Sequence, residues 1–326
     1  MIVSDQNGTD LPYRVGLVLG SGASRGWAHI GAIEALQDSG IPIHMVAGVS
    51  VGAFVGAVFA SGGLENLKNY VLEMDGESMF SFSDLTLLRS GLLDGDKKLR
   101  ALFDMHTDKK SFEELEMPLK VVAVDMDSGD PVVLDSGDLL TALRASLSYP
   151  GLFAPVFHKG RWLIDGGVVD PVPVGVARAM GSDIIIAVNL DSRLVSRKRH
   201  REPVPEPEVE AAPVRSEFLN QLAARYDAVE RRIRERFESL TKDRTPGTRQ
   251  VINSAIQIMQ ERIARVNFAV TPPDILITPR LGDLKMLDYD QVGHSIEEGY
   301  IATRKKVEDI KLLMETMAGG PDRETR

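Results

Sequence analysis

The chain of 326 residues contains no cysteine. This absence excludes disulfide bonds, thiolate metal ligands and a cysteine nucleophile, and it fits a reducing compartment. Positive charge is also in short supply, because 47 acidic residues outnumber 38 Lys and Arg residues and leave a net charge of −9. The composition therefore lacks the basic footprint of a nucleic-acid-binding protein, and we expect no nucleic-acid partner.

Long hydrophobic runs are missing as well. The longest one, at 46–60, is too short and too rich in small residues to span a bilayer. The polar residues at 1–12 include no apolar segment of the kind that a secretory signal needs. We therefore expect a cytoplasmic protein, and association with the inner face of the membrane would be peripheral.

Apolar runs alternate with glycine-rich turns and amphipathic segments through most of the chain. This alternation predicts an α/β fold built from right-handed β-α-β units. Strands are predicted at 15–19, 42–49, 119–125, 131–134, 161–164, 183–189 and 274–278. Helices are predicted at 27–38, 51–60, 138–146, 172–180 and 296–314, the second of these helices directly following residue 50.

The composition changes at Ser192, where a basic stretch and then a Pro/Glu-rich stretch predict a solvated linker. Beyond it, apolar residues recur at spacings of three and four over 218–240 and 252–266, which predicts two helices in a hairpin. The expected divisions are a flexible arm at 1–13, a catalytic core at 14–191, a linker at 192–214, a helical hairpin at 215–268, a strand and helix that complete the core at 269–316, and a polar tail at 317–326.

Three roles are open for the helical hairpin. It forms a lid or membrane-docking element, a dimer interface, or a helix pair packed on the core with solvated arginines. The arginines in question could meet anionic lipid, but glutamates are interleaved with them, which favours packing on the core. These arginines are Arg231, Arg232, Arg234 and Arg236.

Ser50 lies in the sequence Gly48-Val49-Ser50-Val51-Gly52, between a predicted strand and a predicted helix. This spacing is typical of a nucleophile elbow, in which a strained turn exposes the serine hydroxyl and its glycine neighbours relieve crowding. The N-terminus of the following helix favours a developing negative charge at the serine. The alternative is a Gly/Ser turn without chemistry.

A second glycine-rich turn, Gly-Ser-Gly-Ala-Ser-Arg-Gly, spans 20–26 after the first predicted strand. Small residues at this place let backbone N–H groups approach a ligand oxygen, as an oxyanion hole requires. A dinucleotide-binding loop is the competing interpretation, but Arg25 stands where that motif needs its third glycine. We therefore favour the oxyanion hole.

A serine nucleophile also needs a base. No histidine has a context that suggests this role, and each is expected to be structural; the six are His29, His44, His106, His158, His200 and His294. Asp165 follows a short predicted strand, and Gly166 and Gly167 leave space beside its carboxylate. An aspartate within hydrogen-bond reach can deprotonate a serine directly. An Asp-Gly hairpin turn is the alternative.

In this order and at these intervals, the turn at 20–26, the elbow at 48–52 and Asp-Gly-Gly at 165–167 resemble the patatin-like phospholipase family. The similarity is to the bacterial branch related to the catalytic domain of neuropathy target esterase. It covers about residues 14–191, and 273–300 is similar to the segment that follows the core in that branch. Three ordered motifs are far more specific than any one of them.

The resemblance implies a patatin-like three-layer α/β/α fold with a mostly parallel central sheet, plus a C-terminal helical segment. It implies a Ser-Asp dyad without a histidine, in which Ser50 is the nucleophile and Asp165 the general base. The backbone N–H groups of Gly22, Ala23 and Ser24 would form the oxyanion hole, at a place where many members have three consecutive glycines. The residues that support these motifs are Gly20, Arg25, Gly26, Gly48, Gly52, Gly166 and Gly167.

The implied activity is hydrolysis of lipid acyl esters, of the phospholipase A or lysophospholipase type, through an acyl-enzyme and without a metal or other cofactor. For Arg25 we favour a role in tying the loop down over a role in binding an anionic head group. Homo-oligomerisation through the helical segment is a further expectation. Two other functions stay open: a non-catalytic or regulatory module that binds lipid or a partner, and acyl transfer to an acceptor other than water.

Overall fold

The structure is a computed structural model that describes residues 3–4, 10–73, 86–87, 93–94, 96–190, 248–282, 284 and 291–319. The chain divides into two compact units, one of residues 1–197 with 256–326 and the other of residues 198–255. The expected linker at 192–214, the helix expected at 218–240 and His200 lie outside the described residues. In the segment expected to be a flexible arm, β1 (Val3–Ser4) pairs antiparallel with β2 (Asp10–Leu11).

A mixed eight-stranded sheet forms the centre of the first unit. Its order is β12-β11-β3-β4-β7-β10-β9, and β8 pairs with β7 in addition. Neighbours are parallel from β12 to β7, whereas β7 pairs antiparallel with both β8 and β10, and β10 with β9. The strands are β3 (Val15–Leu19), β4 (Met45–Val49), β7 (Leu119–Asp125), β8 (Pro131–Leu134), β9 (Val156–His158), β10 (Arg161–Asp165), β11 (Ile184–Val188) and β12 (Ile275–Ile277).

Helices cover both faces of this sheet, because its buried strands are apolar on both sides. Side chains of β3 alternate between two cores, with Leu17 and Leu19 in the larger one and Val18 in the smaller one. The larger core joins the sheet to α1 (Ala28–Asp38), α2 (Val51–Ala60), α3 (Leu64–Glu73), α10 (Val292–Arg304) and α11 (Val307–Ala318). The smaller core joins it to α7 (Val174–Ala179) and α9 (Thr248–Val270). The expected three-layer α/β/α arrangement is thus confirmed.

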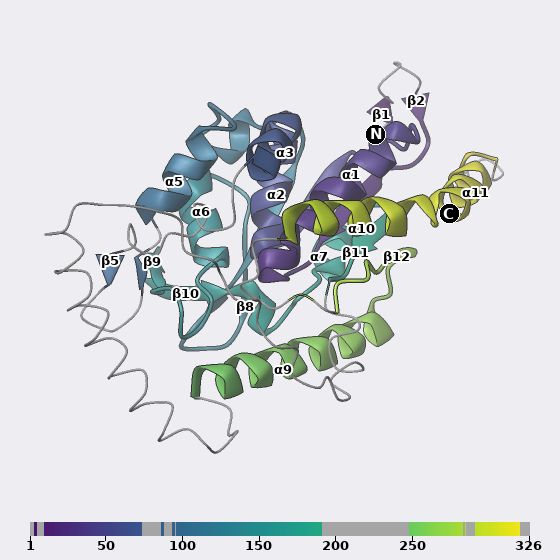
Figure 1. Cartoon of the computed structure of the whole chain (residues 1–326). Helices are drawn as coiled ribbons and strands as arrows, with labels where there is room; N and C mark the ends of the chain where they lie inside the picture. The colour runs from purple at the N-terminus through teal and green to yellow at the C-terminus, as the bar shows by residue number, and fades with distance from the viewer. Residues whose placement is uncertain are drawn as a thin grey trace, which may run out of the picture. The chain divides into compact units, whose positions relative to one another are not determined.

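Helix α10 crosses α1 at a very short distance, and the two lie side by side in Figure 1. A Cβ atom at Gly31 would lie 1.9 Å from the carbonyl oxygen of Ile296, and one at Gly299 would lie 1.9 Å from that of Ala28. Only glycines permit this approach of two helix backbones. The C-terminal part of the chain therefore packs directly against the first helix of the core.

The single helix expected at 296–314 is wrong in its length, because the chain bends between α10 and α11 at Lys305 and Lys306. Neither residue is a glycine or a proline, so the sequence contains no local signal for the bend. Val307 and Ile310, which follow it, are both buried in the larger core. We infer that their burial sets the new helix direction.

Strands β4 and β10 meet end to end along the same edge of β7. In the β7 register, Val49 of β4 is opposite Val122, and Asp165 of β10 is opposite the next residue, Ala123. Strand β8 occupies the other edge over 121–124, so β4 and β10 must share this one. Because β4 runs parallel to β7 and β10 runs antiparallel to it, their carboxyl ends face each other. This junction brings the residue after Val49 next to Asp165.

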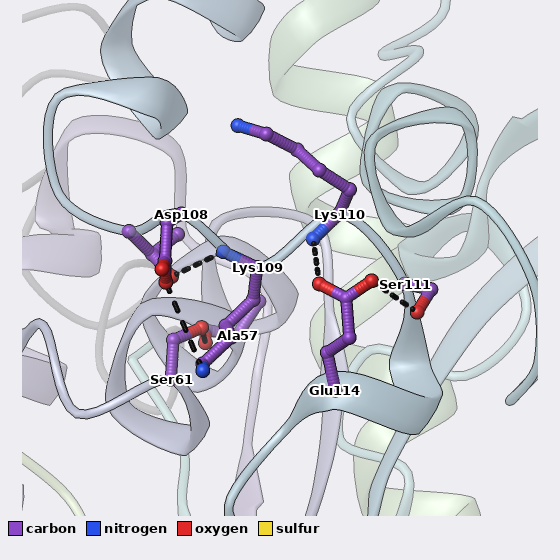
Figure 2. Close-up of polar contacts among 8 residues, drawn as sticks. Ala57, Ser61, Asp108, Lys109, Lys110, Ser111 and Glu114 are labelled. Carbon is purple, nitrogen blue, oxygen red and sulfur yellow. Dashed lines mark hydrogen bonds and ion pairs between the residues drawn. The ribbon is translucent and has the colours of Figure 1, made fainter.

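The short loop before β7 is held by one glutamate, as Figure 2 shows. The backbone N–H of Lys110 and the hydroxyl of Ser111 donate to the two carboxylate oxygens of Glu114, at 2.9 and 3.1 Å. The N–H of Leu139 donates to the Lys110 carbonyl at 2.9 Å and so joins this loop to α6 (Leu139–Ser146). Asp138 caps α6 by accepting the Thr141 N–H at 2.7 Å.

None of the helices in the described ranges is both long enough and apolar enough to cross a bilayer. A further helix, α5 (Asp96–Asp104), packs near α6.

Candidate active site

Ser50 stands at the turn between β4 and α2 with φ 55° and ψ −129°. A positive φ is rare for a residue with a side chain and stores of the order of 1–3 kcal/mol of strain. A Cβ atom at Gly48 would lie 2.7 Å from the Cα of Ala53, and one at Gly52 would lie 2.2 Å from the carbonyl oxygen of Leu19. Both glycines are therefore needed for close backbone contact: Gly48 lies against the helix of the elbow, and Gly52 lies against the neighbouring strand β3.

The hydroxyl of Ser50 donates a hydrogen bond of 2.6 Å to Oδ2 of Asp165. Ser50 is 7% exposed and Asp165 is 1% exposed, so this contact is almost fully shielded from solvent. The second oxygen of Asp165, Oδ1, accepts the N–H of Gly167 at 2.8 Å. One carboxylate oxygen is thus held by the backbone, and the other is directed at the serine. The Ser50 hydroxyl donates to a carboxylate and not to a histidine.

Helix α6 supports both residues from its C-terminal end. The hydroxyl of Ser146 accepts the Ser50 N–H at 2.8 Å and donates to the Val122 carbonyl at 2.7 Å. The carbonyl of Ser148 accepts the Asp165 N–H at 3.1 Å. Both serines are fully buried. Sequence reasoning did not identify them, because nothing in the local sequence around Ser146 distinguishes it from any other helical serine.

The glycine-rich turn at 20–26 lies against the elbow. A Cβ atom at Gly26 would lie 2.1 Å from a methyl carbon of Val51, the first residue of α2. The turn leads into a 3-10 helix, Ala23–Trp27, in which Ala23 has φ 51°. Its first internal hydrogen bond runs from the Arg25 N–H to the Gly22 carbonyl at 3.2 Å. The N–H groups of Gly22 and Ala23 precede that bond and so have no partner within the helix.

The side chain of Arg25 is buried, and its Nε donates to the carbonyl of Gly22 at 3.1 Å. The guanidinium therefore contacts the backbone of its own turn. This contact is the one expected of a residue that ties the loop down.

His29 is fully buried in α1, and its Nε2–H donates to the carbonyl of Gly20 at 2.8 Å. That carbonyl oxygen lies only 2.5 Å from the place of a Cβ atom at Gly52, so His29 holds the turn beside the elbow. His44 accepts the Val15 N–H at 2.8 Å, and His106 packs against the ring of Tyr70. These are structural contacts, as the sequence predicted for these histidines.

Burial lowers the pKa of His29 from 6.5 to about 4, and the hydrogen bond to Gly20 offsets part of this effect. The unfolded chain therefore binds a proton near pH 6.5 that the folded chain does not bind until about pH 4. Because of this residue, we expect the free energy of unfolding to decrease by about 1.4 kcal/mol for each unit by which the pH is lowered within that window. Urea unfolding of the His29→Gln variant between pH 7 and pH 4 should show a shallower decline than the wild type. Equal slopes for the two proteins would contradict this assignment.

Two further polar side chains converge on the turn after Asp165, and the sequence did not reveal them. A Cβ atom at Gly167 would lie 2.8 Å from Nε2 of Gln260 and 3.2 Å from the Cβ of Ser21. Gln260 lies on α9 and is almost fully buried, as is Ser21. The two residues are far apart in sequence, so only the packing of α9 beside the turn brings them together.

The described ranges contain no cluster of three or more His, Asp or Glu side chains that could hold a metal ion. The groups brought together at the elbow are hydroxyl, carboxylate and backbone N–H groups. Such a set can deprotonate a nucleophile and stabilise an oxyanion.

Comparison with known proteins identifies the family of this chain. The Patatin family model, described as patatin-like phospholipase, matches residues 17–178. An uncharacterized NTE family protein of Mycobacterium tuberculosis is 30% identical over 334 residues, which cover 92% of this chain and 92% of that protein. The chain belongs to the patatin-like phospholipase family. Its similarity to NTE family proteins extends over nearly its whole length, in agreement with the branch expected from the three motifs.

A fungal relative matches a smaller part of the chain. Lysophospholipase nte1 of Aspergillus fumigatus is 33% identical over 184 residues, which cover 55% of this chain and 12% of that protein. Among solved structures, VipD from Legionella pneumophila has a TM-score of 0.46 and 15% identity, over 94% of this chain and 70% of its own. Membership of the patatin-like phospholipase family places the chain among lipid-ester hydrolases.

Proposed function

We propose that this patatin-like phospholipase is a serine hydrolase of the phospholipase A or lysophospholipase type, with Ser50 as nucleophile and Asp165 as general base. The observation that carries the proposal is the 2.6 Å hydrogen bond from the Ser50 hydroxyl to the Asp165 carboxylate at a strained elbow. A lysophospholipid is the favoured substrate, since the fungal relative is named a lysophospholipase.

In the first step, the Ser50 oxygen attacks the carbonyl carbon of the acyl ester while Asp165 accepts the hydroxyl proton. The carbonyl oxygen gains the negative charge, and the N–H groups of Gly22, Ala23 and Ser24 stabilise it. The N-terminus of α2 adds a favourable field at the same place. When the tetrahedral intermediate collapses, the alcohol leaves with the proton from Asp165, and the acyl group stays on Ser50.

In the second step, Asp165 takes a proton from a water molecule that attacks the acyl-enzyme. Collapse releases the fatty acid and returns the proton to Ser50. The Gly167 N–H keeps the carboxylate oriented through Oδ1, so Oδ2 serves as base in both steps. Ser146 and Ser148 are positioning residues in this scheme, because they contact only the backbone of the reacting residues.

The test of this proposal combines labelling with product analysis. A fluorophosphonate probe should modify Ser50, identified by mass spectrometry of the peptide that contains it. With lysophosphatidylcholine the protein should release fatty acid and glycerophosphocholine, and diacyl phosphatidylcholine should be cleaved more slowly. A protein that neither reacts with the probe nor releases fatty acid would be the non-catalytic module. Acylation of an added alcohol in preference to water would identify an acyltransferase.

A further inference from the structure

The face of α9 that packs on the core carries polar side chains beside apolar ones, and Ala264 and Phe268 of that face join the smaller core. Gln260, Glu261, Ala264 and Asn267 are buried or half-buried, and the Asn267 amide donates to Asp170 at 3.2 Å. Together with the contact between Gln260 and the Gly167 turn, this bond fixes α9 beside the segment that follows Asp165. The apolar stripe at 252–266 is not the side that packs on the core, because Met259 and Val266 of that stripe are 53% and 63% exposed.

The opposite side of α9 is largely apolar and faces solvent. At 100° per residue, one arc of the helix contains seven residues that alternate with the buried set. Its four large apolar side chains are between 50% and 79% exposed. We call this arc the outer face of α9, and it consists of Ile258, Met259, Arg262, Arg265, Val266, Ala269 and Val270.

The charge on the outer face is positive, although the chain as a whole carries −9. Arg262 and Arg265 are exposed on it, beside the apolar side chains. Glu261 is the single acidic residue of α9, and it is buried on the inner side, where it pairs with Arg265. Arg262 lies within the apolar arc and Arg265 at its edge, and exposed apolar side chains with arginine and no exposed acid on the same helix favour the interface of an anionic membrane.

We propose that the outer face of α9 docks on an anionic lipid surface. The inference rests on the proposed function, because a lipid hydrolase must reach substrate held in a membrane or micelle. The apolar side chains enter the boundary of the acyl chains, and the aliphatic part of Arg262 lies along it with its charge at the head groups. Since Gln260 on the inner side contacts the turn after Asp165, docking holds that turn one helix diameter, ~10–12 Å, from the lipid surface.

Vesicle sedimentation tests this proposal without any catalytic turnover. All proteins carry Ser50→Ala, so that the lipid stays intact. Phosphatidylcholine vesicles with phosphatidylglycerol should bind the parent protein, and Met259→Asp with Val266→Asp should weaken that binding about tenfold or more. Arg262→Gln should reduce the preference for vesicles with phosphatidylglycerol over phosphatidylcholine alone. The matched control is Leu312→Asp, which changes an apolar residue of α11 that is 66% exposed and should leave binding unchanged.

Two results would overturn the proposal. One is equal binding by the parent and the Met259→Asp/Val266→Asp protein. The other is a dimer of the parent, measured by light scattering, that the same two substitutions dissociate, because the outer face would then be an interface between two copies. Neither result bears on Ser50, whose role is measured separately by fluorophosphonate labelling of the wild type.

Discussion

Replacement of Ser50 by alanine is expected to lower ester hydrolysis by about 10⁴-fold or more, because no acyl-enzyme can form without the hydroxyl. The variant should fold, since the substitution removes the hydroxyl that donates to Asp165, while the backbone N–H keeps its bond to Ser146. The assay is release of fatty acid from lysophosphatidylcholine, with thermal unfolding measured in parallel.

Ser61→Ala is the matched control for this experiment. Ser61 lies just beyond the other end of α2, and its hydroxyl donates to the Ala57 carbonyl at 2.6 Å, as drawn in Figure 2. This substitution removes a serine hydroxyl at the far end of α2 and leaves the elbow unchanged, so activity should stay close to that of the wild type. Substantial hydrolysis by Ser50→Ala would mean that another residue is the nucleophile.

Replacement of Asp165 by asparagine should lower hydrolysis by about 10²- to 10⁴-fold, the range that a general base contributes. The amide oxygen of asparagine can still accept the Gly167 N–H, but its NH₂ group would then face Ser50 and cannot take a proton. The hydroxyl therefore keeps its proton and is a weak nucleophile. Fluorophosphonate labelling should slow together with hydrolysis, because both begin with attack by Ser50.

Asp125→Asn is the control for Asp165→Asn, because it changes a nearby carboxylate that takes no part in the proposed mechanism. Asp125 ends β7 next to β10, where its Oδ1 accepts the Asp127 N–H at 3.0 Å and its Oδ2 lies 3.7 Å from Nε of Arg161. Asparagine preserves the first of these contacts, and we expect nearly full activity. If Asp165→Asn and Asp125→Asn had the same small effect, the dyad would be wrong, and the base would have to be sought elsewhere.

The apolar pattern of α9 shows where sequence periodicity is informative and where it is not. Spacings of three and four predicted a helix over 252–266, and α9 covers that range. They did not reveal which side of the helix meets the core. The inward placement of Gln260 and Asn267 depends on partners at Gly167 and Asp170, nearly a hundred positions earlier in the chain. Periodicity contains no information about such partners.

Local sequence determined the elements that carry the chemistry. Gly48, Ser50 and Gly52 mark the elbow in the sequence by their spacing, although only Gly48 is crowded by a near neighbour, Ala53, whereas Gly52 meets Leu19 of β3. The three motifs in order were also sufficient to indicate the family. These features could be predicted because each motif is contained in a short stretch of the sequence.

Only the tertiary structure decided which residues meet. Ser50 reaches Asp165 because a parallel strand and an antiparallel strand end at adjacent residues of β7, Val122 and Ala123. Ser146 joins the same junction from a helix that no pattern connects to the elbow. Strand register and helix docking are set by burial summed over the whole sheet, and that sum involves residues too far apart in sequence for any local motif to record it.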